Sequence, residues 1–225
     1  MPEIVLHQWE ISPFCGKVRR ILEHKQLAYT TVNYNGLRAR KAAGLSGPGT
    51  LPVIDYDGER VQDSSDIAEF LESRHPTPPL YPRDPIERAE AHIYEDWADE
   101  SLYWFEVYLR FKYEEPRNRS VALLAAGRPS FERVLMSSVM KSRFKKKLDA
   151  QGLGRLAPER VEAKFLAHAD ALDAILTSKR WLVGDSRTIA DIAVQSQLAE
   201  VARTSHLAPE LAKRTHVTEW LTRSA

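Results

Sequence analysis

The stretch that decides the fold is ISPFCGKVRRIL, residues 11–22, where a serine and a proline precede an amphipathic run. Ser12 stands where a helix N-cap belongs, and Pro13 suits the first turn because its missing N–H would be unpaired there anyway. The apolar residues that follow recur on one helical face: Val18, Ile21, Leu22 and Leu27. The β-like run EIVLHQW, residues 3–9, comes before it. We therefore expect a strand, a short turn and a helix that begins near Ser12.

The first turn of that helix has chemistry of its own. Its free N–H groups and the helix dipole favour an anion, and a thiol placed there has its pKa lowered. One interpretation is that Ser12 only caps the helix and Cys15 is a small buried side chain. The other is that the Ser12 hydroxyl serves a ligand. Cys15 is the one cysteine of the chain, which excludes both an internal disulfide and a CxxC dithiol site.

The rest of the first 75 residues continues in short α/β units. AYTTVNY (28–34) predicts a strand, and the basic stretch 35–50 a loop with one helical turn. Residues 51–63 predict two strands around Asp57-Gly58, a strong hairpin signal. SSDIAEFLESRHP predicts a helix over 64–76 that stops at its proline. The expected order is β-α-β-α-β-β-α.

A change of composition then marks a domain boundary. The segment HPTPPLYPRDP, residues 75–85, holds five prolines and cannot continue a helix. Beyond it the periodicity is helical. We expect an α/β domain over 1–75, a linker over 76–85 and an all-helical domain over 86–225. Within the last, the expected helices cover 86–113 (one long helix or a kinked pair), 129–150, 158–178, 189–203 and a final one near 209–223.

Bulk composition excludes several function classes. The chain has 225 residues, 43% of them hydrophobic and 28% charged, with a formal net charge of +1. This balance gives no electrostatic reason to expect nucleic acid or an anionic membrane as a partner. No apolar run approaches the roughly 20 residues of a membrane-spanning helix, and the N-terminus lacks a secretory pattern. The histidines show no ligand spacing, so we expect no metal site and a cytoplasmic protein.

Two further segments give the opening motif a context. GTLPVID (49–55) carries a Leu-Pro pair just before a strand, and VQDSSDI (61–67) carries Asp-Ser at a helix start. GDSRTIADIAV (184–194) has a capping-box spacing between Thr188 and Asp191. Together these segments resemble the glutathione transferases, with their thioredoxin-like N-terminal domain and all-helical C-terminal domain.

This resemblance implies roles for particular residues, with glutathione as co-substrate. Ser12 would donate a hydrogen bond to the glutathione sulfur and favour the thiolate. A cis Leu51-Pro52 bond would present the Leu51 backbone to the cysteinyl part. The γ-glutamyl end would be held by Asp63 and Ser64, which also fit an ordinary helix cap. The implied glutathione-binding set is Phe14, Thr50, Leu51, Pro52, Asp63 and Ser64.

One position departs from the family pattern. Many transferases carry lysine or glutamine where this chain has Thr50. Arg38, Arg40 and Lys41 lie in the preceding loop and could instead meet the glycyl carboxylate of glutathione, or they could be solvated surface charge.

A second site is expected on the helix after the linker. Trp97, Trp104 and Tyr108 fall on nearly one face of a regular helix, where the family has part of its electrophile pocket and dimer contact. Packing in the core is the alternative interpretation. The carboxylates of the same stretch are expected to form a solvated acidic face: Glu95, Asp96, Asp99, Glu100 and Glu106.

Two functions from different classes stay open, with a third behind them. The first is a glutathione transferase, expected as a homodimer, that acts on an apolar electrophile. The second is a non-catalytic protein-binding member, resembling a bacterial cell-division branch that binds FtsZ. The basic cluster in 140–155, within the long connection 113–155, is a possible docking surface for an acidic protein. A thiol reductase using Cys15 is the third.

Overall fold

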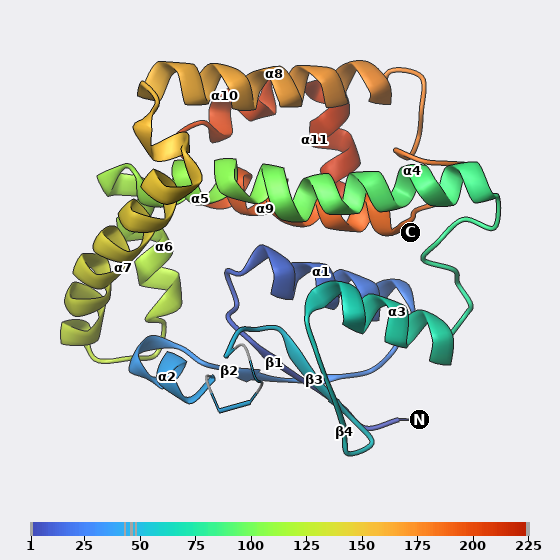
Figure 1. Ribbon diagram of the computed structural model, residues 1–225, viewed down its shortest axis with the longest axis horizontal. Coiled ribbons are helices and arrows are strands. Elements are labelled where there is room, and N and C mark those ends of the chain that lie inside the picture. Colours follow the sequence, from blue (N-terminus) through green and yellow to red (C-terminus); the bar gives the residue numbers. More distant parts are fainter. Residues whose placement is uncertain (1, 43, 46, 48, 224–225) are drawn as a thin grey trace.

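The N-terminal part of the computed structural model, which describes residues 2–42, 44–45, 47 and 49–223, is built on a mixed sheet (Figure 1). Its strands are β1 (Ile4–Gln8), β2 (Thr30–Asn33), β3 (Val53–Tyr56) and β4 (Glu59–Gln62). The strand order is β2-β1-β3-β4; β1 runs parallel to β2, and β3 is antiparallel to both of its neighbours. The expected thioredoxin-like domain is confirmed.

Two helices lie on the side of this sheet that faces the helical domain, α1 (Pro13–His24) and α3 (Ser64–Arg74) (Figure 1). The apolar stripe of α1 is fully buried, at Val18, Ile21 and Leu22. α1 packs against both α3 and α9 (Ile189–Thr204), so one helix joins the two domains. The predicted helical turn after β2 is η1 (Gly36–Arg38) followed by α2 (Ala39–Ala42).

The two turns that sequence patterns singled out take the expected conformations. Asp57 and Gly58 have φ of 48° and 86°, and a two-residue hairpin of the I′ type needs positive φ at both positions. The Leu51-Pro52 peptide bond is cis.

The helical domain begins at Pro85 and contains one long, irregular rod followed by shorter helices (Figure 1). The rod consists of α4 (Pro85–Asp96), the π-helical turn η2 (Trp97–Leu102) and α5 (Tyr103–Phe111). The final helix expected near 209–223 is divided into two helices, α10 (Ala208–Ala212) and α11 (Thr215–Thr222), because the backbone of Arg214 leaves the helical region, with a ψ of 87°. The remaining elements are α6 (Glu114–Leu124), α7 (Ser130–Gln151), η3 (Leu153–Arg155) and α8 (Pro158–Leu176).

The start of α9 organises the core of this domain. Asp191 accepts hydrogen bonds of 2.9 Å from the backbone N–H groups of Thr188 and Leu182. Its carboxylate also accepts one of 2.9 Å from the indole N–H of the fully buried Trp220. The predicted capping box is confirmed, and it ties α9 to α11 as well as closing its own first turn.

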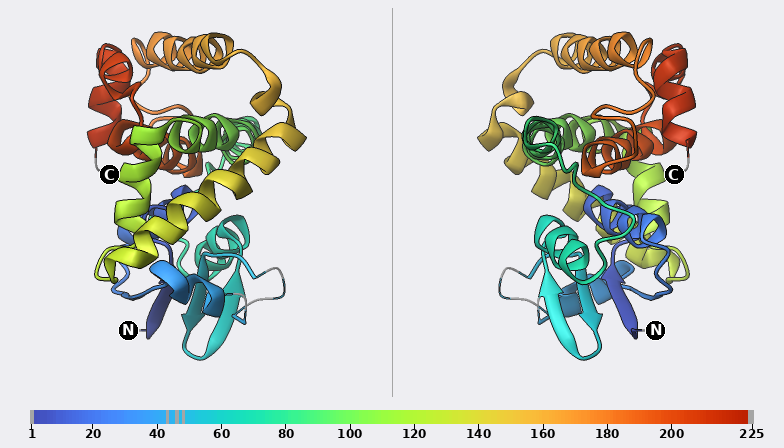
Figure 2. Two further views of the ribbon diagram at one scale, coloured as in Figure 1. Left: turned by 90° about the vertical axis from the view of Figure 1, so that its left-hand side faces the viewer. Right: turned by 90° about the vertical axis from the view of Figure 1, so that its right-hand side faces the viewer.

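Helices α6 and α7 form an arm, residues 114–151, that reaches down beside the sheet domain (Figure 2). The Leu37 backbone N–H donates a 2.9 Å hydrogen bond to the Glu132 carboxylate of α7. The Asn35 amide donates one of 3.1 Å to the Ala126 carbonyl between the two arm helices. The long connection 113–155 therefore places α7 along one side of the interdomain space. Within the described part of the chain, no helix is long and apolar enough to span a membrane.

Candidate active site

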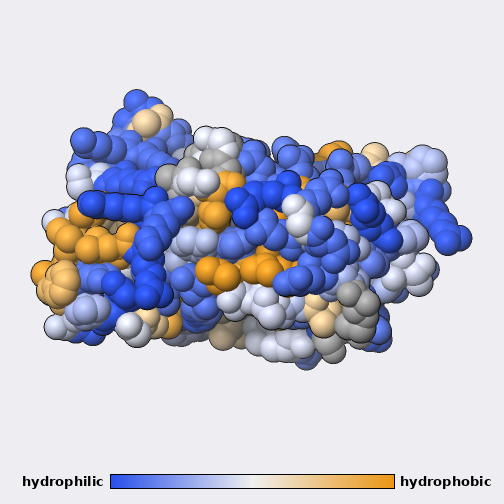
Figure 3. Space-filling model, turned by 90° about the horizontal axis from the view of Figure 1, so that it is seen from below, coloured by the Kyte–Doolittle hydropathy of each residue, from blue (hydrophilic) through white to orange (hydrophobic). Residues whose placement is uncertain are grey.

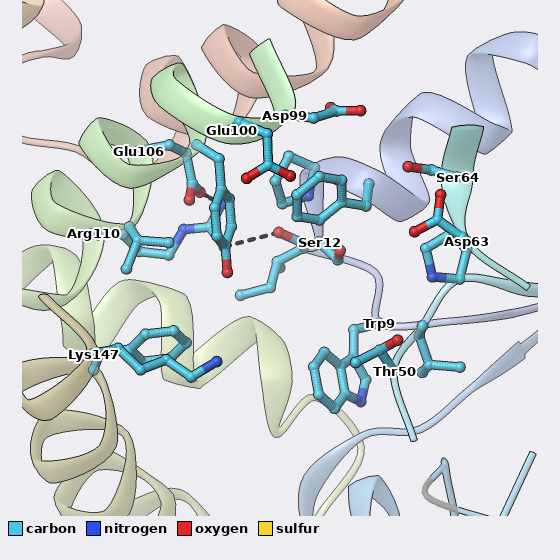
Figure 4. A pocket seen from close by; sticks show the side chains of 18 of the residues that line it. Trp9, Ser12, Thr50, Asp63, Ser64, Asp99, Glu100, Glu106, Arg110 and Lys147 are labelled. Atoms are coloured by element: carbon cyan, nitrogen blue, oxygen red, sulfur yellow. Dashed lines mark hydrogen bonds and ion pairs between the residues drawn. The ribbon is translucent and has the colours of Figure 1, made fainter. Parts of the chain in front are cut away.

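A cavity of about 680 Å³ opens between the sheet domain and the helical domain. Its walls come from the β1–α1 turn, the loop before β3, the start of α3 and helices α4 to α7 (Figure 4). The structure brings the residues expected at the catalytic and glutathione-binding positions to this one cavity: Ser12, Phe14, Thr50, Leu51, Pro52, Asp63 and Ser64.

Ser12 lies at the centre of the cavity wall and caps α1 (Figure 4). Its Oγ accepts a 3.4 Å hydrogen bond from the Cys15 backbone N–H. Its own backbone N–H donates a 3.0 Å bond to the Trp9 carbonyl, which fixes the turn. A hydroxyl that accepts at its oxygen still has a proton to donate. Capping and ligand binding are therefore compatible at Ser12.

Cys15 faces away from the cavity and is fully buried. Burial raises the pKa of its thiol to about 11, and this outweighs the opposing hydrogen bond with Ser12. The lowered pKa expected from the helix N-terminus is thus wrong for this thiol. A thiolate nucleophile needs a low pKa and exposure, so Cys15 is a packing residue and the reductase hypothesis loses its nucleophile.

The start of α3 presents a second helix N-terminus to the same cavity. Asp63 has a φ of 70° and caps α3, accepting a 2.9 Å hydrogen bond from the Ser65 backbone N–H. Ser64 is buried at the first helical position, and its hydroxyl has no hydrogen-bond partner among the described residues. First-turn N–H groups with a free hydroxyl suit a carboxylate, and an exposed aspartate beside them suits an ammonium group.

A buried lysine forms ion pairs with two of the carboxylates that were expected to be solvated. The Lys17 ammonium, on α1, lies 2.6 Å from the Glu95 carboxylate and 2.7 Å from that of Asp99, and it donates a 3.0 Å bond to the Ser65 hydroxyl. Burial raises the pKa of Asp99 although Lys17 opposes the rise. The expected solvated acidic face is therefore wrong for Glu95 and Asp99, because Lys17 holds them between the domains.

A second buried ion-pair network lies on the α5 side. Glu106 forms an ion pair with Arg110 one turn later, and Arg110 also lies 3.2 Å from the Glu200 carboxylate. Glu106 is only 1% exposed, so the prediction of a solvated side chain is wrong here too. Burial raises the pKa of Glu106 to about 7, and Arg110 limits the rise. Asp96 and Glu100, by contrast, are exposed.

The aromatic residues expected at the second site lie elsewhere. Trp97, Trp104 and Tyr108 are not among the residues that line the cavity. Trp97 packs edge-on against His168, and Tyr108 is fully buried against Tyr113. The expected face assumed a regular helix, whereas the π-helical η2 adds a residue to one turn and rotates everything after it. All three pack in or against the hydrophobic core, as the alternative interpretation expects.

The cavity is instead lined on this side mostly by residues of α5 and the arm. Tyr103 lines the cavity and packs on the Phe14 ring, with ring centroids 4.8 Å apart. Phe111 and Phe144 stack with centroids 4.0 Å apart. Apolar residues on this side of the lining are Ile11, Val107, Phe111, Leu124, Met136, Met140 and Phe144. The arm residues are not predictable from local sequence, because only the docking of α7 onto residues 35–37 brings them to the site.

The cations of the cavity also differ from expectation. Arg38, Arg40 and Lys41 are exposed and do not line it. The arginines and lysines that do are Arg110, Arg143 and Lys147. Within the described ranges, no cluster of histidine, cysteine or carboxylate side chains could hold a metal ion.

Comparison with known proteins agrees with this geometry. The family model for the N-terminal domain of glutathione S-transferases matches residues 6–79, and the model for their C-terminal domain matches residues 135–225. The chain belongs to the glutathione S-transferase family. The residues of the cavity wall that precede α4 thus lie in a recognised transferase N-terminal domain.

Two relatives of this transferase-family chain have names that indicate different functions. It is 25% identical over 199 residues to the isoprene-epoxide–glutathione S-transferase of Rhodococcus sp., covering 86% of this chain and 81% of the relative. It is 22% identical over 205 residues to FtsZ-localized protein A of Caulobacter vibrioides, covering 88% and 77%. A solved glutathione S-transferase from Methylobacterium radiotolerans, in complex with glutathione sulfonate, is 26% identical, with a TM-score of 0.59 and coverage of 96% and 90%.

Proposed function

We propose that the protein is a glutathione transferase that joins the glutathione thiolate to an apolar electrophile. The observation that carries this proposal is the shared cavity. Ser12 lies on its wall at the α1 N-terminus, with Leu51, Asp63 and Ser64 on one side and the apolar residues of α5 and the arm on the other. A polar cleft beside an apolar one suits a reaction between a peptide thiol and an apolar partner.

The proposed binding mode follows the polar side of the cavity. The Leu51 backbone pairs with the cysteinyl residue of glutathione, next to the cis Pro52. Ser64 and the N–H groups at the start of α3 receive the γ-glutamyl carboxylate. Asp63, exposed at the cap, meets the ammonium group.

Ser12 has the catalytic role in this proposal. Its hydroxyl donates a hydrogen bond to the glutathione sulfur and stabilises the thiolate over the thiol. A hydrogen bond to a charged group contributes about 1.5–3 kcal/mol, and one pKa unit corresponds to about 1.4 kcal/mol. Ser12 can thus lower the thiol pKa by about one to two units. The thiolate then attacks the electrophilic atom, a carbon–sulfur bond forms, and the electron pair leaves with the displaced group.

Calorimetric titration of the protein with reduced glutathione tests this function. We expect saturable binding that weakens in Ser64→Ala, because the γ-glutamyl carboxylate loses a donor. Ser73→Ala is the matched control: that hydroxyl donates a hydrogen bond to the Phe70 carbonyl, and Ser73 does not line the cavity. A folded protein that gives no heat up to millimolar glutathione would contradict the proposal.

A second candidate function is protein binding, and the outer face of α7 favours it. Four large apolar side chains on the arm are exposed to solvent: Phe131, Val134, Leu135 and Val139. Figure 3 shows apolar surface at the side of the molecule where α6 and α7 lie. The similarity to FtsZ-localized protein A suggests FtsZ as the protein to try. Co-sedimentation with FtsZ filaments that is lost in Val134→Lys but kept in Val32→Lys, an exposed position on β2, would support this function. Loss in neither variant would contradict it.

The homodimer expected from the family has a candidate surface on α4. Ile86 and Ile93, seven residues apart and so on one helical face, are 72% and 70% exposed. Large apolar side chains exposed in a row are typical of an interface. We propose that this face of α4 contacts a second copy of the chain.

A further inference from the structure

We propose that Arg143 and Lys147 of α7 form a carboxylate-binding site at the end of the cavity opposite Asp63 and Ser64. The inference rests on the proposed function for the identity of the reactants. Beyond that function, it assigns a binding role to two residues of the arm and a carboxylate to the ligand that they bind.

The first observation is the pattern along α7. The α7 residues that line the cavity are Met136, Met140, Arg143, Phe144 and Lys147. Their spacing of four, three, one and three places them on one stripe of the helix. The N-terminal part of the stripe is apolar, and its C-terminal part carries the two cations. A ligand that lies along the stripe therefore contacts apolar surface at one end and positive charge at the other.

The second observation is that these two cations have no carboxylate partner. No ion pair joins Arg143 or Lys147 to any described acidic residue, whereas Lys145 on the same helix pairs with Asp149 at 2.6 Å. Partial burial and then the charge of Arg143 lower the pKa of Lys147. Residues 143 and 147 are also one helical turn apart on α7, so their positive charges lie close enough to repel. A bound anion would relieve that repulsion.

The third observation is the distribution of charge across the cavity. The other lining cation, Arg110, is neutralised by Glu106 and Glu200. Acidic groups that line the cavity come from α3 with its cap and from α4 and η2: Asp63, Glu69, Asp96 and Glu100. In Figure 4, Lys147 extends into the cavity from α7, Asp63 and Ser64 lie on the far side, and Ser12 lies between them. The cavity thus fits a ligand with an ammonium at one end and a carboxylate at the other, or two reactants that share these charges.

One ligand chemistry, a carboxylate, can come from two sources. It can be the glycyl carboxylate of glutathione, which the exposed Arg38, Arg40 and Lys41 do not reach in this cavity. It can also be an acidic group on the second reactant, whose apolar body would lie against Met140 and Phe144.

The test compares the wild-type protein with the double variant Arg143→Gln/Lys147→Gln. The matched control is Lys141→Gln/Lys146→Gln, which removes the same charge from exposed α7 positions outside the cavity. The probes are glutathione, its glycyl ethyl ester, 2-naphthoate and the uncharged 2-naphthamide, each titrated by calorimetry at two salt concentrations. Circular dichroism establishes that both variants are folded.

We expect the double variant to bind one carboxylate probe about tenfold more weakly, while the control binds as the wild type does. We also expect the salt dependence of that probe's binding to weaken, because screening acts on these exposed charges. A loss with glutathione but not with its ester assigns the glycyl carboxylate. A loss with 2-naphthoate but not with 2-naphthamide or glutathione assigns the second reactant.

Two further outcomes separate this inference from the proposed function. In one outcome the wild type binds 2-naphthoate but no glutathione, and the double variant no longer binds 2-naphthoate. That outcome overturns the transferase function and supports the carboxylate site. Equal binding of every carboxylate probe by the wild type and the double variant, or an equal loss in the control variant, overturns the site.

Discussion

The guanidinium of Arg110 donates a 2.9 Å hydrogen bond to the backbone carbonyl of Ile11, the residue directly before Ser12. Arg110 belongs to α5, and it is also held by the buried carboxylates of Glu106 and Glu200. The position of the proposed catalytic serine is therefore fixed by the helical domain as well as by its own helix cap.

Replacing Arg110 with leucine should destabilise the fold strongly. The change leaves Glu106 buried without a cation and leaves Glu200 with only Arg203, at 3.7 Å. Breaking a buried pair typically costs about 3–5 kcal/mol. Urea denaturation measures the free energy of unfolding. The control is Arg119→Leu, whose pair with Glu115 is exposed and should contribute less than about 1 kcal/mol. Similar losses in the two variants would show that the buried network does not hold the domains together.

Glu106 should make stability depend on pH. Its folded pKa of about 7 lies above the usual 4.5, so between these values the folded state binds more protons than the unfolded state. Stability from this group is full below about pH 4.5 and falls as the pH rises to about 7, by about 3 kcal/mol at most. Glu106→Gln removes the titration, so its stability relative to the wild type should increase over this window. Unfolding curves at several pH values check this, and parallel pH profiles for the two proteins would exclude the effect.

The N-terminal half of the site was predictable because its signals are local. The Ser12 cap, the Asp57-Gly58 turn and the helix start at Ser64 each depend on residues close in sequence, and the structure has all three. The capping box of Thr188 and Asp191 is equally local. The direction of the Cys15 pKa was less predictable, because it depends on burial by residues that are distant in sequence.

The helical half was less predictable because its geometry depends on distant contacts. The aromatic face that includes Trp104 and Tyr108 was drawn on a regular helix, and the π-helical η2 changes the register of α5. The acidic residues Glu95 and Asp99 looked solvated because their partner, Lys17, lies about 80 positions away in sequence, on a helix of the other domain. Met140 and Lys147 reach the cavity only because the arm docks beside the sheet.

Ser12→Ala should reduce the transferase rate without unfolding the protein. Loss of the proposed hydrogen bond to sulfur should lower kcat/KM by about 10- to 100-fold, while loss of the helix cap costs about 1 kcal/mol of stability. Steady-state kinetics with an aryl halide measures the first effect and thermal unfolding the second. Ultraviolet titration of bound glutathione should show a higher thiol pKa in the variant. An unchanged rate in the folded variant would remove Ser12 from the mechanism.

The double substitution Ile86→Lys/Ile93→Lys should turn a homodimer into a monomer. Two ammonium groups at an apolar contact would have to be desolvated without partners, which association does not repay. Sedimentation velocity gives the mass directly. Phe131→Lys, which changes an exposed apolar side chain on the arm instead, is the control and should leave the mass unchanged. Dimers that persist in the double variant would place the interface on another face.

Gly36→Ala should detach the arm from the sheet domain. Gly36 has a φ of 62°, and a Cβ added there would lie 2.1 Å from the Glu132 carboxylate oxygen that accepts the Leu37 hydrogen bond. A non-glycine residue at positive φ costs about 1–3 kcal/mol. The Glu132 carboxylate must also move away, which breaks its hydrogen bond with the Leu37 backbone. We expect lower stability in urea, faster hydrogen exchange over residues 35–37 and weaker binding of apolar ligands in the cavity. Gly58→Ala is the control, because it also has positive φ but meets no atom within 4 Å, so it should cost stability without changing ligand binding. If the two variants bind ligand equally well, the docking of α7 does not shape the cavity.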